Sequence, residues 1–249
     1  MTLSIRQFPC LVDNYGFLVR DDATGQVAAI DTPDAEAILA DLDASGWGRL
    51  DCIYNTHWHP DHAGGNARLK EVTGCTIIGP QEVTRIAPLD QAVAGGDEVR
   101  LGETTFRILD VGGHTLGHIA WWSPEAGAAF VGDSLFVLGC GRMFEGTPEQ
   151  FWAGLQRLAA LPPETTVHCA HEYSEANARF ALSVDDDPAV TARAEVIFSL
   201  RQRGLPTVPT TIGLERATNP FLRAPDLRPG LDAVAAFADI RAAKDGFKG

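Results

Sequence analysis

The sequence has 249 residues, enough for one large domain or for a domain with a smaller second one. Hydrophobic residues make up 45% and charged residues 21%, which argues against a disordered, collagenous or coiled-coil chain. The formal net charge of −13 would repel the phosphates of nucleic acid and the headgroups of anionic lipids, so neither a nucleic acid nor a membrane is an expected partner.

The apolar runs are all shorter than the roughly 18 residues of a transmembrane helix, and the N-terminus lacks the pattern of a secretory signal. The five cysteines include no CxxC pair, which is more typical of reduced thiols than of disulfides or a zinc ribbon. We therefore expect a cytoplasmic protein, and a monomer is the expected assembly.

Short β-rich runs separated by Gly, Pro and Asp dominate the first part of the chain. Strands are predicted within residues 5–12, 15–21, 26–32, 50–56, 75–80, 105–111, 119–124 and 128–136. A helix is predicted to follow Thr32 as cap, with Pro33 at its first position, and another to follow Thr147 as cap. A further helix is predicted over residues 66–74.

After about residue 172 the strand-like runs disappear. Amphipathic helices are predicted within 175–184, 189–204 and 229–245, and a proline-rich, ordered loop precedes the last of them. The charge changes as well, because residues 1–172 hold 10 Lys+Arg against 23 Asp+Glu, whereas residues 173–249 hold 10 of each. The sequence therefore predicts two domains, 1–172 and 173–249.

The segment NTHWHPDHAGGN contains three of the seven histidines of the chain. An apolar strand precedes it and a helix follows, so it is predicted to form a loop between them. In an extended segment, His57 and His59 point to one side and can bind one ion. Asp61 and His62, at the end of the loop, turn toward a second position. One loop could thus serve two metals.

Further ligand candidates stand at the ends of other β-like runs: His114, Asp133 and His171. Imidazole and carboxylate without thiolate are typical of an open catalytic site for Zn(II), Fe(II) or Mn(II). Asp133 could bridge two ions, and a hydroxide could form a second bridge, since two nearby cations acidify a shared water. Two divalent ions per chain are predicted, with zinc expected first and iron or manganese as alternatives.

Other polar and aromatic residues near these runs have plainer interpretations. His118 is expected to support a ligand or to be a core polar residue, and His168 to be structural. Asp31 is equally compatible with a carboxylate at the start of a helix and with an acceptor for a ligand imidazole. Trp121 and Trp122 are expected to pack in the core and on a sheet face.

These motifs resemble those of the metallo-β-lactamase superfamily, whose signature is T-H-x-H-x-D-H with a distant His, Asp and His. Within it the chain is similar to the glyoxalase II (hydroxyacylglutathione hydrolase) family along nearly its whole length. The segments that carry this similarity are FPCLVDNY, GGHTLGHI, GDSLFVLGCGRMFEGTPEQ, HEY, TVPTTIGLERATNPFLR and RAAKDGF. The resemblance implies an α/β fold: a four-layer αββα sandwich followed by a small all-α, glutathione-binding domain.

The resemblance also implies roles for individual residues. The first metal would be held by His57, His59 and His114, the second by Asp61, His62 and His171, and Asp133 would bridge them. Asp61 and Asp133 would be catalytic through the bridging hydroxide. The glutathione moiety would be bound by Arg142, Phe144, Tyr173, Arg241 and Lys244. Phe144 stands where some members have Tyr, so one hydrogen bond to the substrate would be missing.

The activity implied is hydrolysis of S-D-lactoylglutathione and related S-2-hydroxyacylglutathiones to glutathione and D-lactate, the second step of methylglyoxal detoxification. The metal-bridging hydroxide would attack the thioester carbonyl. One alternative is a glutathione persulfide dioxygenase that uses a single iron, which metal content would distinguish. A non-catalytic metal-binding protein is a second alternative. β-Lactamase activity is disfavoured, because Asp133 stands where zinc β-lactamases commonly use Cys.

Overall fold

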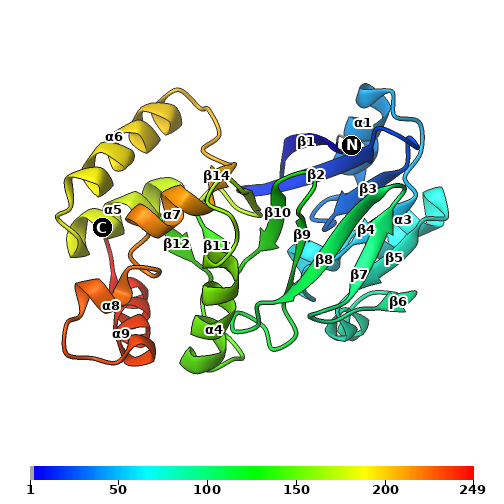
Figure 1. Cartoon of the computed structure of the whole chain (residues 1–249). Helices are drawn as coiled ribbons and strands as arrows, with labels where there is room; N and C mark the ends of the chain where they lie inside the picture. The colour runs from blue at the N-terminus through cyan, green and yellow to red at the C-terminus, as the bar shows by residue number, and fades with distance from the viewer. Residues whose placement is uncertain (1–2) are drawn as a thin grey trace. The chain divides into compact units, whose positions relative to one another are not determined.

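The computed structural model describes residues 3–249, and packing divides the chain into two compact units (Figure 1). Unit 1 comprises Met1–Asp110 and Gly117–Gly132, and unit 2 comprises Val111–Leu116 and Asp133–Gly249. The boundary predicted between residues 172 and 173 was placed where the strand-like runs end and the charge balance changes. It differs from the division by packing, and it stays a prediction. Among the described residues, no helix combines the length and the apolar character needed to span a membrane.

Unit 1 contains a mixed sheet and an antiparallel sheet. The mixed sheet has the order β1-β2-β3-β4-β5-β6; its first three strands are antiparallel and the pairs from β3 to β6 are parallel. Its strands are β1 (Leu3–Cys10), β2 (Asn14–Asp21), β3 (Val27–Ile30), β4 (Cys52–Tyr54), β5 (Thr76–Gly79) and β6 (Gln91–Ala92). The antiparallel strands, in sheet order, are β7 (Glu98–Leu101), β8 (Thr104–Asp110), β9 (Ile119–Ser123) and β10 (Ala128–Gly132).

Aromatic side chains pack between these two sheets. Tyr54 of β4 stacks on Trp121 of β9 with ring centroids 4.4 Å apart, and Phe17 of β2 meets Phe130 of β10 edge to face at 5.6 Å. Trp121 is fully buried, as predicted, while Trp122 lies on the sheet face with the Arg107 guanidinium 5.7 Å from its ring. The two sheets of unit 1 therefore enclose one apolar layer.

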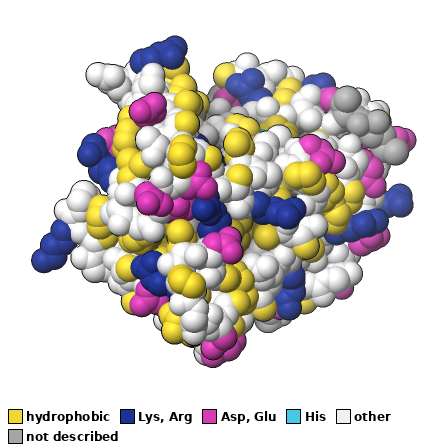
Figure 2. All heavy atoms as spheres, turned by 60° about the vertical axis from the view of Figure 1, so that its left-hand side comes forward, with side chains coloured by type: hydrophobic (Ala, Val, Ile, Leu, Met, Phe, Trp, Pro, Cys, Tyr) yellow, Lys and Arg dark blue, Asp and Glu magenta, His cyan; other side chains and the backbone are white. Residues whose placement is uncertain are grey.

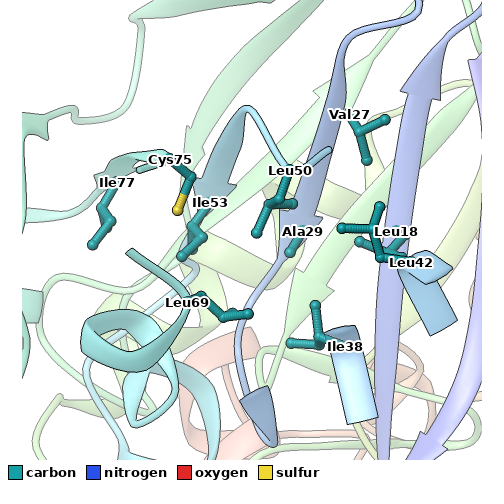
Figure 3. Packing of buried hydrophobic residues seen from close by; sticks show 10 residues of the cluster. All are labelled: Leu18, Val27, Ala29, Ile38, Leu42, Leu50, Ile53, Leu69, Cys75 and Ile77. Atoms are coloured by element: carbon teal, nitrogen blue, oxygen red, sulfur yellow. The ribbon is translucent and has the colours of Figure 1, made fainter. Parts of the chain in front are cut away.

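Helices cover the other face of the mixed sheet. Ile38 of α1 (Ala35–Ser45) and Leu69 of α3 (Asn66–Thr73) are directed toward sheet residues that include Ala29 and Ile53 (Figure 3). Helix, sheet and sheet are three of the four layers expected of the sandwich. The α/β class predicted from the sequence is confirmed.

The cap predicted for α1 was wrong. Asp34 caps the helix, because its carboxylate accepts hydrogen bonds from the backbone N–H groups of Glu36 and Ala37. Thr32 instead donates its hydroxyl to Asn66 Oδ1 at 2.7 Å, which removes it from the helix N-terminus. Pro33 thus precedes the helix.

Unit 2 is mainly helical. Thr147 caps α4 (Pro148–Ala159), as predicted, by accepting from the Gln150 N–H. The predicted C-terminal helices are α5 (Ser174–Val184), α6 (Pro188–Gln202) and α9 (Ala233–Gly246). The proline-rich stretch, predicted as a loop, also forms α7 (Ile212–Thr218) and α8 (Ala224–Leu227). Short strand pairs join β11 (Leu135–Phe136) to β12 (Gly139–Cys140) and β13 (Thr166–Cys169) to β14 (Thr210–Thr211).

A buried polar network fixes the turn between β11 and β12. Asn219, at the end of α7, donates its amide to the carbonyls of Phe136 at 3.1 Å and Gly139 at 2.9 Å. The same amide contacts Glu215, a fully buried carboxylate that pairs with Arg193 of α6. A buried charge is tolerated only when it is paired and hydrogen-bonded, and here the pairing ties the C-terminal helices to this turn.

Shortening Ile53 tests the core of unit 1. Ile53 is fully buried between Ala29 and Ile77 in the parallel part of the sheet. Ile53→Ala should lower the free energy of unfolding in urea by about 3 kcal/mol, since it removes apolar area and leaves a cavity. Val72→Ala, at a residue that is 49% exposed on α3, is the control. Equal effects of the two substitutions would contradict this packing.

Candidate metal centre and substrate pocket

The histidine loop begins at the carboxyl edge of two neighbouring parallel strands. β3 runs into Asp31 and β4 runs into Asn55, and the side chains of His57 and His62 that follow are buried. The Asn55 amide donates to the carbonyl of His62 at 3.0 Å, which closes the loop on itself. A buried hydrogen bond from the residue that follows β4 therefore helps to close the loop.

Asp31 organises this loop. Its backbone has φ +56°, an uncommon value for a residue with a side chain, and its carboxylate is buried. One oxygen accepts from the backbone N–H of Thr56 at 2.7 Å. The other accepts from the Thr56 hydroxyl at 2.7 Å and from His62 Nδ1 at 2.9 Å. Because Asp34 caps the helix, Asp31 is an acceptor for the loop and not part of the helix terminus.

These bonds fix which nitrogen of each imidazole carries the proton. Thr56 has a single hydroxyl proton and gives it to Asp31, so it accepts the proton of His57 Nδ1, which lies 3.0 Å away. His62 gives its Nδ1 proton to Asp31 directly. In both rings Nε2 therefore presents a lone pair, the form that binds a metal.

The structure brings the predicted residues of the loop together in two pairs. His57 Nε2 lies 3.0 Å from His59 Nδ1, and His62 Nε2 lies 3.6 Å from Asp61 Oδ2. His57 and His59 are therefore close together, as the alternation predicts, but the His57 ring centroid is also 4.0 Å from that of His62. The division of these residues between two ions stays a prediction.

In unit 2, Asp133 lies between two histidines. Its Oδ2 is 3.3 Å from His114 Nε2, and its Oδ1 is 3.3 Å from His171 Nε2. His114 Nδ1 donates to the carbonyl of Arg142 at 2.7 Å, which again leaves Nε2 with the lone pair. Gly141 makes this arrangement possible, because a Cβ there would lie 2.0 Å from the carbonyl oxygen of Asp133.

The donor set of both units fits divalent ions. It consists of imidazole nitrogens and carboxylates, and the two oxygens of one carboxylate each lie 3.3 Å from a histidine Nε2. The other two histidines have different surroundings. His118 stacks on His57 with centroids 4.5 Å apart, and burial lowers the pKa of His168 to about 4. Both outcomes match their predicted supporting and structural roles.

A cavity of about 380 Å³ opens beside His114 and Asp133 within unit 2. Every residue predicted to bind glutathione lines it: Arg142, Phe144, Tyr173, Arg241 and Lys244. Cys140 is also in its wall, but burial raises the pKa of this thiol to about 11, so it is protonated near neutral pH and is no nucleophile. The wall of this pocket thus contains basic side chains next to His114 and Asp133, two of the predicted metal ligands.

The cations of this pocket differ in what they can offer a ligand. Arg142 is exposed. Arg241 is buried and donates to the carbonyl of Cys140 at 3.0 Å and to Asp245 at 2.8 Å, so its visible role is to shape the wall. On the face shown in Figure 2, basic and acidic side chains are interspersed.

The side chain of Lys244 loses its proton at a lower pH than an ordinary lysine does. Its ammonium donates to the carbonyl of Ala176 at 2.9 Å. Burial, followed by repulsion from Arg241 and Arg142, lowers its pKa to about 8. An arriving anion would restore the charged form, because it replaces repulsion with attraction.

Two aromatic residues border the same pocket. Tyr173 is 38% exposed and its ring stacks on His171 with centroids 4.7 Å apart. Phe144 is 61% exposed, and its ring centroid lies 5.2 Å from that of His114. Both rings can therefore touch a bound ligand and a metal-binding imidazole.

Several residues that support these side chains were not predicted from the sequence. Thr56 precedes His57 directly, so its position was a usable signal. Asn14 donates to Asp61, and Asn177 donates to the carbonyl of Val137 beside the pocket. These contacts depend on strand and helix placement, which no local pattern reveals.

Comparison with known proteins agrees with this geometry. Residues 28–171 match the model of the metallo-beta-lactamase superfamily, and residues 172–247 match that of the hydroxyacylglutathione hydrolase C-terminus. A hydroxyacylglutathione hydrolase of Erythrobacter litoralis is 55% identical over 98% of this chain and 100% of its own length. The one from Maricaulis maris is 50% identical over 98% of this chain and 99% of its own length.

The chain belongs to the hydroxyacylglutathione hydrolase family. Among solved structures it is similar to ETHE1 from Myxococcus xanthus, with a TM-score of 0.72, 28% identity, and coverage of 96% of this chain and 90% of that one. It is also similar to TTHA1623 in a di-iron-bound form, with a TM-score of 0.63, 28% identity, and coverage of 88% and 100%. The superfamily and the His and Asp donors of the chain indicate divalent metal ions.

The titration of Lys244 checks the pocket electrostatics. Because its pKa is lowered to about 8, the side chain should be a cation below that pH and largely neutral above it. Labelling with acetic anhydride at increasing pH, followed by mass spectrometry, should give a midpoint near 8. Arg142→Ala should move the midpoint upward, since Arg142 is one of the repelling cations. A midpoint near the ordinary value of 10.5 would contradict the pocket as described.

Proposed function

We propose that this protein hydrolyses S-D-lactoylglutathione and related S-2-hydroxyacylglutathiones to glutathione and the free hydroxy acid. The observation that carries the proposal is Asp133, whose two oxygens lie 3.3 Å from His114 Nε2 and 3.3 Å from His171 Nε2, at the wall of a pocket that Arg142 and Lys244 also line. A site for two ions next to cations for an anionic substrate is what metal-assisted thioester hydrolysis needs. Membership of the family supports the same reaction.

Two metal ions are proposed for this chain. His57, His59 and His114 would hold the first ion, Asp61, His62 and His171 the second, and Asp133 both. The support is that the pairs within unit 1 and the His-Asp-His group of unit 2 each supply fewer atoms than two ions require. Zinc is proposed as the metal, with iron and manganese as the alternatives. When bound, such ions supply an activated water at neutral pH and stabilise a developing oxyanion.

The residues of the chain have defined tasks in this reaction. Asp31 and Thr56 hold the proton on Nδ1 of His57, which leaves Nε2 for the metal. Arg142 and Lys244 would attract the carboxylates of glutathione against the overall charge of −13. The glutathione thiolate can leave without a strong acid, because thiols ionise near pH 8.5. Since Lys244 loses its charge above about pH 8, the KM should rise there.

The wider assignments are also proposals. A catalytic domain over residues 1–172 and a glutathione-binding domain over 173–249 are supported by the family models, which match 28–171 and 172–247. A cytoplasmic location is supported by five cysteines that are all free thiols in the described chain. A monomer is proposed as the assembly, and the pocket that lies within unit 2 is compatible with it.

Steady-state hydrolysis of S-D-lactoylglutathione, with bound metals counted on the same sample, tests the proposal. Rapid turnover that a chelator abolishes, with about two ions per chain, is expected. Asp133→Asn should lower both metal loading and turnover, because a neutral amide cannot serve two cations. Asp186→Asn, at an exposed carboxylate, should change neither.

Two results would count against the hydrolase. An absence of turnover with a single bound iron would favour a glutathione persulfide dioxygenase. A fall in metal loading of Asp133→Asn with no change in turnover would favour a protein that binds metal without using it in catalysis.

Phe144→Tyr tests the missing hydrogen bond. The ring is exposed at the pocket, so an added hydroxyl can reach a bound peptide. One hydrogen bond contributes about 1 kcal/mol, so KM for S-D-lactoylglutathione should fall by roughly fivefold while kcat changes little. Phe144→Leu, which lacks a hydroxyl, should not lower KM. An unchanged KM in the Tyr variant would place residue 144 outside the glutathione contacts.

A further inference from the structure

Asn14 lies at the start of β2, where the hairpin with β1 closes. It pairs with Cys10 across the hairpin, and only 6% of its surface is exposed. A buried amide needs hydrogen-bond partners, because an unpaired polar group in the interior costs free energy. Asn14 finds partners on the histidine loop, far away in the sequence.

The side chain of Asn14 contacts Asp61 at two points. Its Nδ2 donates to Asp61 Oδ2 at 3.1 Å and lies 3.4 Å from the carbonyl oxygen of the same residue. Since an ionised carboxylate only accepts hydrogen bonds, the NH₂ group of the amide must face it. The sheet therefore supplies a fixed donor to this carboxylate.

The side chain of Asp61 depends on such a donor for its orientation more than the buried side chain of His62 does. Asp61 lies in the four-residue helix α2 (Pro60–Ala63), and its side chain is 38% exposed, whereas His62 is buried. Burial alone does not select one rotamer for a side chain this exposed. A donor on Oδ2, the oxygen that lies 3.6 Å from His62 Nε2, keeps the two side chains facing one point.

We propose that Asn14 is a positioning residue for the second metal ion, the one assigned to Asp61, His62 and His171 under the proposed function on which this inference rests. The amide is neutral, so it orients the carboxylate and leaves its negative charge available to the ion. A lysine in its place would neutralise that charge. Ordering the side chain before the ion arrives removes part of the entropy cost of binding. Asn14 acts on metal affinity and not on the reacting atoms.

The contacts of Asp31 provide a comparison with those of Asn14. Asp31 reaches His62 directly and His57 through Thr56, so it supports residues of both proposed ion sites. Asn14 reaches only Asp61 among the proposed ligands in the described contacts. The structure therefore distinguishes a residue that supports both ions from one that supports a single ion.

Metal affinity tests this division without using activity. The metal-free protein is titrated with Co(II) against a chelator, and NMR follows the Nδ1–H protons of His57 and His62 as reporters of the first and second sites. In Asn14→Ala the second site should weaken by about tenfold to a hundredfold, the usual effect of losing a partner of a ligand, while the first changes less than threefold. Asp31→Asn should weaken both sites.

Controls separate positioning from folding. Val12→Ala changes a residue of the same hairpin that is 99% exposed, and it should leave both affinities unchanged. Asn14→Leu keeps the volume and loses the donor, so it should behave like Asn14→Ala. Asn14→Gln keeps a donor on a longer stem and should recover part of the affinity. Urea unfolding of each variant in the metal-free state measures any loss of stability.

Two outcomes overturn the inference, and they are distinguishable. If the wild type binds two ions and Asn14→Ala and Asn14→Leu weaken neither site, or weaken both equally, Asn14 does not position the second ion. If the wild type binds one ion only, the proposed two-ion centre fails and the inference fails with it. Selective weakening of the His62 reporter in both variants supports the proposal.

Discussion

The buried carboxylate of Asp31 is the constraint on which the histidine loop depends. It accepts from the backbone and hydroxyl of Thr56 and from His62, and through Thr56 it also fixes the proton of His57. A buried carboxylate that accepts from three donors holds all three in place. The strained backbone at Asp31 follows from this role, because φ +56° turns the end of β3 toward the neighbouring loop.

In unit 2, a backbone carbonyl orients the histidine where a carboxylate does so in unit 1. His114 is oriented by the carbonyl of Arg142, and that segment is in turn held by Arg241 through the carbonyl of Cys140. The side chain of Arg241 therefore connects α9 to the orientation of an imidazole that is proposed to bind metal. The pocket and the proposed ligands His114 and Asp133 share one wall, so a change in either is expected to alter the other.

The pocket gathers positive charge, although the whole chain is negatively charged. The protein carries −13, yet the pocket gathers Arg142, Arg241 and Lys244 closely enough that repulsion contributes to a lowered pKa of Lys244. Such crowding costs stability in the free protein. It is relieved when an anion binds, which is how a strongly acidic protein can accept an anionic substrate.

The residue types and spacing of the sequence determined the candidate ligands, most of the longer strands, most helices and the family, but they did not predict β7 or give the bounds of β13. His57 and His59 share a side because alternation along an extended chain is a local property, and Pro148 after Thr147 marks a helix start for the same reason. Tertiary structure alone decided between the two interpretations of Asp31, paired the Thr32 hydroxyl with Asn66, and brought Asn14 to Asp61. Those outcomes depend on which elements are neighbours and where each one ends. These contacts join residues 25 to 47 positions apart, beyond the reach of any local pattern.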